Sequence, residues 1–394
     1  MVRILILVSF LLSTTASAVS PATLAGMRAR DVGIPFQGQP GPLNAITDVA
    51  GVRVGHRTLV RGEGPLVVGE GPVRTGVTAI LPTGRDYRPV FAAWSTLNGN
   101  GEMTGTTWIE ESGFLEEPIL LTSTHSVGAV ADASIAWRRE RRFHDATDDL
   151  GWASLPVVAE TWDGRLHDIH GSHIQRDDVF AALDSAASGP VDEGNVGGGT
   201  GMVCHQFKGG IGTASRLTAE GYTIGVLVQA NYGRREDLSI AGVPVGRAIP
   251  DLMPEIAPSG HEGNSIIVIL ATDAPLLPHQ LKRLSKRASI GLARVGGFGA
   301  NSSGDLFLAF SVARRAAHRE DDVQLVPMLP NDQIDPLFIG AAQATEEAII
   351  NALVAAETMT GINGNRVYAL PLDRVKEILR AHNRLNGAAG LFSE

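Results

Sequence analysis

The feature that most constrains the fold is the change from loop to strand at Ser265. A polar segment, Glu262-Gly263-Asn264, ends there, and five aliphatic residues, Ile266 to Leu270, follow without a break. Such a run bounded by turn residues is typical of a short strand buried on both faces. Ser265 therefore places a hydroxyl at the boundary between a loose segment and a rigid one, where a chain can cut itself. A serine that only starts a strand and bonds to nearby backbone fits the local pattern as well.

The composition and the alternation of strand-like and helix-like segments together indicate one compact domain of the α/β or α+β class. Of the 394 residues, 44% are hydrophobic and 19% are charged, which is typical of a globular protein. The 46 glycines predict many tight turns and close backbone approaches. Strand-like and helix-like segments alternate with no linker between them, so we predict a single domain. The one cysteine, Cys204, excludes an intrachain disulfide.

Charge and hydropathy bear on partners and location. A formal net charge of −9 with no strong basic cluster argues against nucleic acid and membranes as partners. Residues 1–18 combine Arg3, an apolar stretch and the pattern Ala16-Ser17-Ala18, which predicts a cleaved secretory signal peptide. No later apolar segment reaches the roughly 20 residues of a transmembrane span. We therefore expect a secreted or periplasmic protein.

Hydrophobic periodicity and turn residues predict nine main elements. The predicted strands are 77–81, 90–94, 155–160, 222–229 and 306–312. The predicted helices are 128–142, 278–292, 341–358 and 373–385. We expect the helix 278–292 to carry Leu281, Leu284 and Ile290 on its apolar face. The helix 341–358 is predicted to be strongly amphipathic and to lie either in the core or at an interface.

Two patterns resemble cofactor sites. Gly194 to Gly201 is rich in glycine, and Glu220 lies where a ribose-binding acid is expected, but no clear strand precedes the glycines and no GK[ST] follows. We interpret these turns as backbone that approaches a substrate. His167, His170 and His173 recur every three residues, but no carboxylate-rich partner completes a tetrahedral set. We expect a histidine cluster in a surface loop, with no metal and no other cofactor.

A conventional serine hydrolase has little support in the sequence. No serine stands in a G-x-S-x-G elbow, and no histidine base is evident. A serine without histidine needs another base, and the α-amine of a chain-terminal serine is one, with a reference pKa of about 7.7 to 8. This requirement points back to Ser265.

Several separate segments, in order along the chain, resemble the self-processing serine aminopeptidases. That family includes the L-aminopeptidase/D-Ala-esterase/amidases and the β-peptidyl aminopeptidases. The segments are Glu262 to Val268, Ala271 to Leu276, Asn98 to Glu102, Trp108 to Gly113, Thr124 to Gly128, Gly194 to Gly197 and Ser302 to Ser311. The resemblance covers nearly the whole mature chain. It implies an αββα four-layer sandwich of the N-terminal-nucleophile type with ornithine-acetyltransferase-like topology.

The resemblance also implies where the chain is cut and which residues act. The cut would fall between Asn264 and Ser265, giving an α polypeptide, 19–264, and a β polypeptide, 265–394, that stay together as one domain. Ser265 maps onto the nucleophile, and Ser303 and Asp305 map onto a serine and an acid that support it. The family usually has glutamate where this chain has Asp305, whose side chain is one CH₂ shorter. Asn231 maps onto the asparagine of the oxyanion hole.

On the substrate side, the resemblance points to Glu160 and Trp162. It implies release of N-terminal amino acids from short peptides, amides or esters, and a homotetramer. Two alternatives stay open: an acyltransferase like the ornithine acetyltransferases, which use threonine as nucleophile, and a secreted binding protein that is never cut. The loop 251–264, which contains Pro254 and Pro258, is expected to be exposed and mobile.

Overall fold

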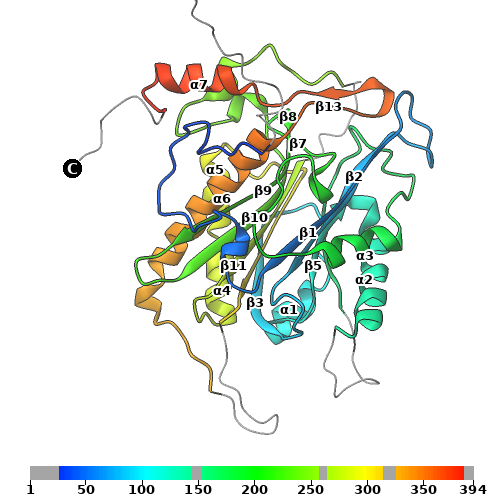
Figure 1. The fold of residues 1–394 in the computed structure, drawn as a ribbon. Coiled ribbons are helices and arrows are strands. Elements are labelled where there is room, and N and C mark those ends of the chain that lie inside the picture. The colour runs from blue at the N-terminus through cyan, green and yellow to red at the C-terminus, as the bar shows by residue number, and fades with distance from the viewer. Residues whose placement is uncertain (1–25, 144–152, 154, 257–263, 314–324, 386–394) are drawn as a thin grey trace, which may run out of the picture.

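Two β-sheets stack face to face, and helices cover both outer faces (Figure 1). The structure, a computed structural model, describes all residues except 1–25, 144–152, 154, 257–263, 314–324 and 386–394. The signal peptide expected at 1–18 and most of the loop before Asn264 lie outside the described residues. The described part of that loop, 251–256, alternates between exposed and half-buried positions. The predicted four-layer α/β architecture is confirmed.

One sheet has four strands and the other has six. The four-stranded sheet has the order β1 (Arg53–Arg61), β2 (Val73–Leu81), β5 (Ile119–Ser123), β6 (Val157–Thr161). The six-stranded sheet has the order β4 (Phe114–Leu115), β3 (Val90–Gly99), β12 (Ser303–Ser311), β11 (Asn264–Thr272), β10 (Thr223–Asn231), β9 (Gly210–Leu217). Neighbouring strands are antiparallel except for the parallel pairs β5–β6 and β11–β12.

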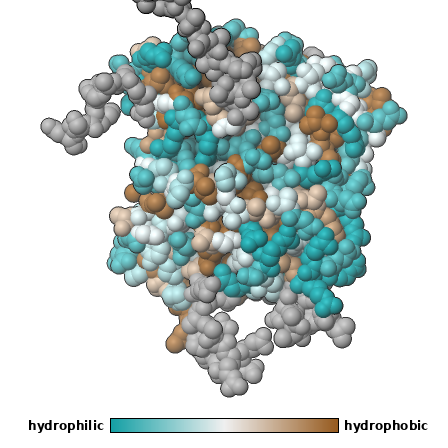
Figure 2. Space-filling model, in the orientation of Figure 1, coloured by the Kyte–Doolittle hydropathy of each residue, from teal (hydrophilic) through white to brown (hydrophobic). Residues whose placement is uncertain are grey.

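The helices form the two outer layers. α2 (Val127–Arg141) and α3 (Arg176–Ser185) cover the four-stranded sheet, where hydrophilic residues gather on the surface (Figures 1 and 2). α4 (Pro278–Ser285), α5 (Ala288–Arg294) and α6 (Asp335–Ala355) cover the six-stranded sheet. The smaller elements are α1 (Thr106–Ser112), α7 (Leu372–Ala381) and the ladders β7–β8 (Val203–Cys204, Phe207–Lys208) and β13–β14 (Met359–Thr360, Arg366–Val367).

Strand β11 shows how alternation builds the layers. Ile266, Val268 and Leu270 face the helices of one outer layer, whereas Ile267 and Ile269 face the other sheet. Successive side chains of a strand point to opposite faces, so a strand between two apolar layers must be apolar throughout. The continuous aliphatic run is therefore a strand buried on both faces, as predicted.

Two predicted helices differ from the structure. The segment 278–292 is not one helix but two, because α4 packs on β3 and β12 while α5 turns to pack against α6. Ile290, expected on the apolar face, is 46% exposed. The helix predicted at 341–358 begins earlier, at Asp335, and ends at Ala355. It is not strongly amphipathic, because buried residues surround most of its circumference. Among the described helices, α6 alone is long and apolar enough to cross a bilayer, and 89% of its most apolar window is buried in the protein.

Both loop segments lie largely inside the protein. The glycines Gly197–Gly199 form a buried turn whose amides donate to Thr58 Oγ1 (2.8 Å) and Thr78 Oγ1 (3.1 Å), so they hold strands β1 and β2 of the four-stranded sheet. His167 and His173 are buried and His170 is exposed, so the histidine cluster is only partly at the surface. His173 Nε2 pairs with Asp168 Oδ2 at 2.8 Å, and the described residues contain no group of three potential metal ligands.

Candidate active site

Ser265 stands at the beginning of β11, where three strands of the six-stranded sheet meet. In the strand register it lies opposite Asn231 of β10 on one side and Gly304 of β12 on the other. The residue before it, Asn264, lies opposite Ser303. Strand pairing alone therefore brings residues that are distant in sequence to the same end of three neighbouring strands.

The Ser265 hydroxyl lies against the peptide bond that precedes it. Its Oγ donates to the Asn264 carbonyl oxygen at 2.5 Å and accepts a hydrogen bond from Gly304 N at 3.2 Å. The side chain is buried, with 5% of the residue exposed. A hydroxyl oxygen in this position is close to the carbonyl carbon of the bond between residues 264 and 265.

Gly304 was not singled out by the sequence, although its backbone contacts the nucleophile candidate. A Cβ at this position would lie 2.5 Å from Asn100 O and 2.8 Å from Gly101 Cα. Only glycine lets the segment 98–101 pass this close to β12. The signal available in the sequence was the glycine between two candidate residues, Ser303 and Asp305.

The Asn231 side chain is held in one orientation by two hydrogen bonds. Its Oδ1 accepts from Val203 N at 2.7 Å, and its Nδ2 donates to Trp162 O at 2.9 Å. The amide group is buried beside Ser265. An amide nitrogen carries two hydrogens, so it is able to donate to more than one acceptor.

Ser303 and Asp305 share one face of β12, two residues apart. Ser303 Oγ donates to Asp305 Oδ1 at 2.6 Å. Burial raises the pKa of Asp305 to about 6, and the bond from Ser303 only partly opposes this rise. Near neutral pH the carboxyl group can therefore exchange a proton, which an exposed aspartate does not do.

Glu160, at the end of β6, faces the same edge from the other sheet. Its carboxylate accepts from Glu102 N at 3.0 Å and from the Thr124 hydroxyl. Burial raises its pKa, whereas these two bonds lower it. A Cβ on Gly101 would lie 3.3 Å from Glu160 Oε1 and 3.2 Å from Gly304 Cα, which places the carboxylate next to the segment that contacts β12.

Trp162 contributes its backbone carbonyl, as the acceptor for Asn231, and a half-buried indole ring. The ring lies against Gly164, where a Cβ would be 2.5 Å from the ring atom Cζ2. Between them, Asp163 accepts from the hydroxyls of Ser123 (2.7 Å) and Thr75 (2.8 Å), which fixes this loop to the four-stranded sheet. The sequence analysis did not single out Asp163.

The structure thus brings Ser265, Asn231, Ser303 and Asp305 together, and it places Glu160 and Trp162 at the adjoining edge of the other sheet. Comparison with known proteins shows the family. The model of peptidase family S58 matches residues 44–367. A β-peptidyl aminopeptidase, BapA, of Sphingosinicella microcystinivorans is 50% identical over 399 residues, which cover 97% of this chain and 98% of the relative.

Solved structures show the same fold. One is the L-aminopeptidase D-Ala-esterase/amidase of Ochrobactrum anthropi, which is described as a prototype of the serine aminopeptidases and a variant of the Ntn-hydrolase fold. It superposes with a TM-score of 0.84 at 47% identity, and the match covers 91% of this chain and 99% of that chain. A β-aminopeptidase from Burkholderia superposes with a TM-score of 0.81 at 49% identity, covering 92% and 100%. The resemblance stated from the sequence is confirmed. The chain belongs to peptidase family S58 and is a serine-type aminopeptidase with the Ntn-hydrolase fold.

Proposed function

We propose that the protein activates itself by cutting its own chain between Asn264 and Ser265, and that the new N-terminal serine is then the nucleophile. The observation that carries this proposal is the 2.5 Å contact between Ser265 Oγ and the Asn264 carbonyl oxygen. Gly304 N donates a hydrogen bond to the same hydroxyl oxygen. An oxygen that rests against a carbonyl group needs only a small movement to attack its carbon.

The cut begins when Ser265 Oγ attacks the Asn264 carbonyl carbon. The peptide bond to Ser265 N breaks, the nitrogen takes up the proton lost by the hydroxyl, and an ester joins Asn264 to Ser265 Oγ. Water then opens the ester, which leaves a carboxylate on Asn264 and a free amine on Ser265. The hydroxyl regains its proton from the water.

In the mature enzyme the Ser265 amine takes the proton of its own hydroxyl while Oγ attacks the substrate carbonyl and forms an acyl-enzyme. Asn231 donates to the oxyanion that develops, because it lies opposite Ser265 and its orientation is fixed. Asp305, when ionised, favours the charged form of the amine, and Ser303 connects the two groups.

The substrates are short peptides, amides or esters with a free N-terminal amine. Glu160 binds that ammonium group, since it is a carboxylate held rigidly by Glu102 N and Thr124 at the edge next to Ser265. Trp162 lines the same side. We include peptides that begin with a β-amino acid, because a relative that is 50% identical is a β-peptidyl aminopeptidase.

After the cut, the α polypeptide (19–264) and the β polypeptide (265–394) stay together. The six-stranded sheet supports this, because strands β11 and β12 of the β polypeptide lie between strands β3 and β10 of the α polypeptide. Residues 1–18 direct export to the periplasm or the medium, and the mature protein assembles as a homotetramer. Size-exclusion chromatography with light scattering of the exported protein tests the assembly, and N-terminal sequencing of its larger fragment tests removal of the signal.

The cut and the nucleophile are tested by Ser265→Ala. This variant should run as one chain on a denaturing gel and hydrolyse no amino-acid p-nitroanilide, while the unaltered protein gives two chains, the smaller reading Ser-Ile-Ile-Val. Ser289→Ala, which removes a hydroxyl from the exposed side of α5, serves as the matched control and should be cut normally. Two fragments from Ser265→Ala would refute the proposal. Transfer of an acyl group to an added amine in preference to water would instead indicate an acyltransferase.

A further inference from the structure

Two buried oxygen atoms beside the active site, Asp305 Oδ2 and Tyr232 Oη, have no hydrogen-bond partner among the described residues. Asp305 is 1% exposed and Tyr232 is 4% exposed. Buried polar atoms without a partner cost free energy, so a native structure has a reason for each of them. Here the two occur together, because both residues line the same cavity.

The cavity has a volume of about 20 Å³. It lies between β12, the loop after β10 and the loop after α5, and its lining includes Tyr232, Asn264, Phe298, Gly299, Ser303 and Asp305. A single water molecule needs roughly 10 to 15 Å³ and two or more polar partners. The cavity meets both conditions.

The position of the Tyr232 ring is fixed by its surroundings. Its edge lies against Gly297, where a Cβ would be 2.9 Å from Tyr232 Cε2, and the His205 ring packs against it with 4.9 Å between the centroids. The backbone is fixed as well, since His205 N donates to Tyr232 O at 2.6 Å. The hydroxyl group is therefore held in place before any ligand arrives.

We infer that one water molecule in this cavity joins Tyr232 Oη to Asp305 Oδ2, and that Tyr232 is thereby a positioning residue for Asp305. The tyrosine hydroxyl donates to the water, and the water donates to the carboxylate. A hydrogen bond to the charged form of an acid favours ionisation, so the bridge opposes the effect of burial on Asp305. This role rests on the proposed function, in which ionised Asp305 acts on the Ser265 amine.

Few other charged or titratable groups face Asp305. β12 contributes Ser303 Oγ and β3 contributes the uncharged Asn98, which lies opposite in the register. The loop after β10 contributes Tyr232 and Arg234, and the segment 296–300 contributes no titratable side chain. From β11 the amine of Ser265 and the new carboxylate of Asn264 join them after the cut. Loss of the tyrosine hydroxyl should therefore be visible in the titration of Asp305.

Tyr232→Phe tests the inference, because it removes the hydroxyl and keeps the ring. In the processed enzyme we expect kcat/KM to fall about two- to fivefold at pH 6 and less than twofold at pH 8, with KM nearly unchanged, since the variant raises the pKa of Asp305 by about 0.5 to 1 unit. The control is Tyr222→Phe, which removes a hydroxyl just before the other end of β10 and should leave both values unchanged. A decrease equal at both pH values, or no decrease, would overturn the inference.

Two further measurements separate this inference from the proposed function. A high-resolution crystal structure of the protein with Ser265→Ala, which never forms the amine, should show a water within hydrogen-bond distance of both Tyr232 Oη and Asp305 Oδ2. A dry cavity or a direct contact between the two oxygens would overturn the inference even if Ser265 is the nucleophile. Should Tyr232→Phe fail to fold, Asp305→Glu replaces it: the longer carboxylate should displace the water and contact Tyr232 Oη directly, and a carboxylate that points away from Tyr232 Oη would count against the bridge.

Discussion

Asp305 and Glu160 are both buried carboxylic acids, yet their surroundings give them different chemistry. Glu160 accepts one backbone and one hydroxyl hydrogen bond, which hold its carboxylate in place. Asp305 accepts one bond from Ser303, and burial raises its pKa to about 6. The charge of Asp305 therefore changes near pH 6, whereas the two hydrogen bonds to Glu160 oppose the rise that burial causes in its pKa.

The raised pKa of Asp305 predicts how stability depends on pH. The folded protein binds this proton more tightly than the unfolded chain, whose aspartate has a pKa of 3.8. The contribution to stability is therefore complete below pH 4 and is lost as the pH rises toward 6, amounting to at most roughly 3 kcal/mol. In the uncut Ser265→Ala protein, Asp305→Asn should remove this part of the pH dependence, measured by urea unfolding at pH 4.5 and 7.5. Asp373→Asn, at a side chain that is 98% exposed, is the control and should retain it.

Asn231 is predicted to act on the transition state. Replacing Asn231 by Ala should lower kcat by about 10²- to 10³-fold with a small change in KM, because a donor to an oxyanion contributes roughly 3 to 4 kcal/mol only while the charge develops. Steady-state kinetics on the processed enzyme measure this split. A rise in KM with normal kcat would assign Asn231 to substrate binding instead.

At the scale of elements, the packing of α6 on β9 depends on small residues. Gly212 of β9 lies directly beneath the helix, where a Cβ would overlap Ala348 O and lie 2.7 Å from Ala352 N. The long helix is buried on most sides, so it cannot shift outward without opening the core. This contact explains why α6 forms part of the core rather than a free amphipathic surface.

Gly212→Ala should therefore destabilise the protein, although alanine is the more favourable residue in most helices and strands. We expect a loss of about 2 kcal/mol or more in the free energy of unfolding, from overpacking against backbone atoms that cannot move aside. The matched control is Gly128→Ala in α2, where a Cβ meets nothing within 4 Å and alanine should stabilise by about 0.5 to 1 kcal/mol. Chemical denaturation of both variants measures the difference. A neutral Gly212→Ala would show that α6 is free to shift.

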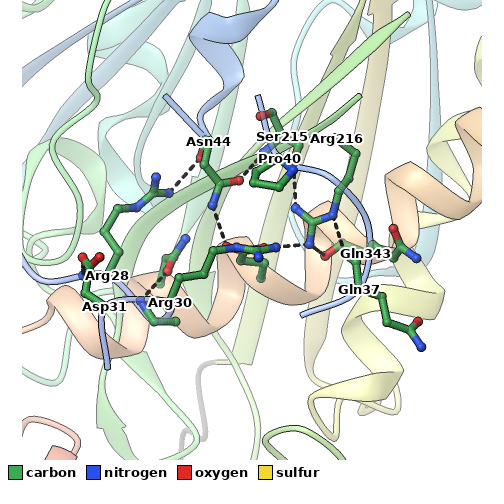
Figure 3. Close-up of polar contacts among 12 residues, drawn as sticks. Arg28, Arg30, Asp31, Gln37, Pro40, Asn44, Ser215, Arg216 and Gln343 are labelled. Carbon is green, nitrogen blue, oxygen red and sulfur yellow. Dashed lines mark hydrogen bonds and ion pairs between the residues drawn. The ribbon is translucent and has the colours of Figure 1, made fainter. Parts of the chain in front are cut away.

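On the scale of the whole molecule, a group of charged and polar side chains joins the first described segment of the chain to strand β9 and helix α6 (Figure 3). Glu347 of α6 is fully buried and accepts hydrogen bonds from Arg30 (2.7 and 2.8 Å), Arg216 of β9 (2.6 Å) and Asn44 (2.6 Å). Burial alone would raise the pKa of Glu347, but the bond from Arg30 and the charges of Arg216 and Arg30 bring it below its ordinary value. The carboxylate is therefore ionised and paired.

Breaking this group from one side should be costly. Glu347→Gln leaves the buried Arg216 guanidinium without its counter-charge, so we expect a loss of roughly 3 to 5 kcal/mol in the free energy of unfolding. The neighbouring Glu346, whose pair with Arg294 is partly exposed, provides the control, and Glu346→Gln should cost less than about 1 kcal/mol. Equal losses in the two variants, measured by thermal or urea unfolding, would contradict the prediction.

Much of the fold could be predicted because its signals are local. The strand after Ser265 follows from an unbroken aliphatic run, and the helix near 128–142 follows from spacing within about 15 residues. The prediction of one continuous helix at 278–292 was wrong. The segment divides into α4, which packs on β3, and α5, which packs on α6, and no local pattern encodes these contacts. The burial of His167 and His173 was missed for the same reason, since a histidine spacing does not say what covers the side chains.

The amino-acid sequence by itself determined the family, the order of most elements and the residue types available at the active site. These depend on short stretches and on the apolar periodicity of each strand or helix. Only the tertiary structure decided which atoms meet. Gly304 N donates to Ser265 Oγ, the Asn231 amide bonds to Val203 N and Trp162 O, and Tyr232 lines the same cavity as Asp305. The physical reason is that these contacts join residues far apart in the chain, whose separation is set by strand register and by the packing of one layer on the next.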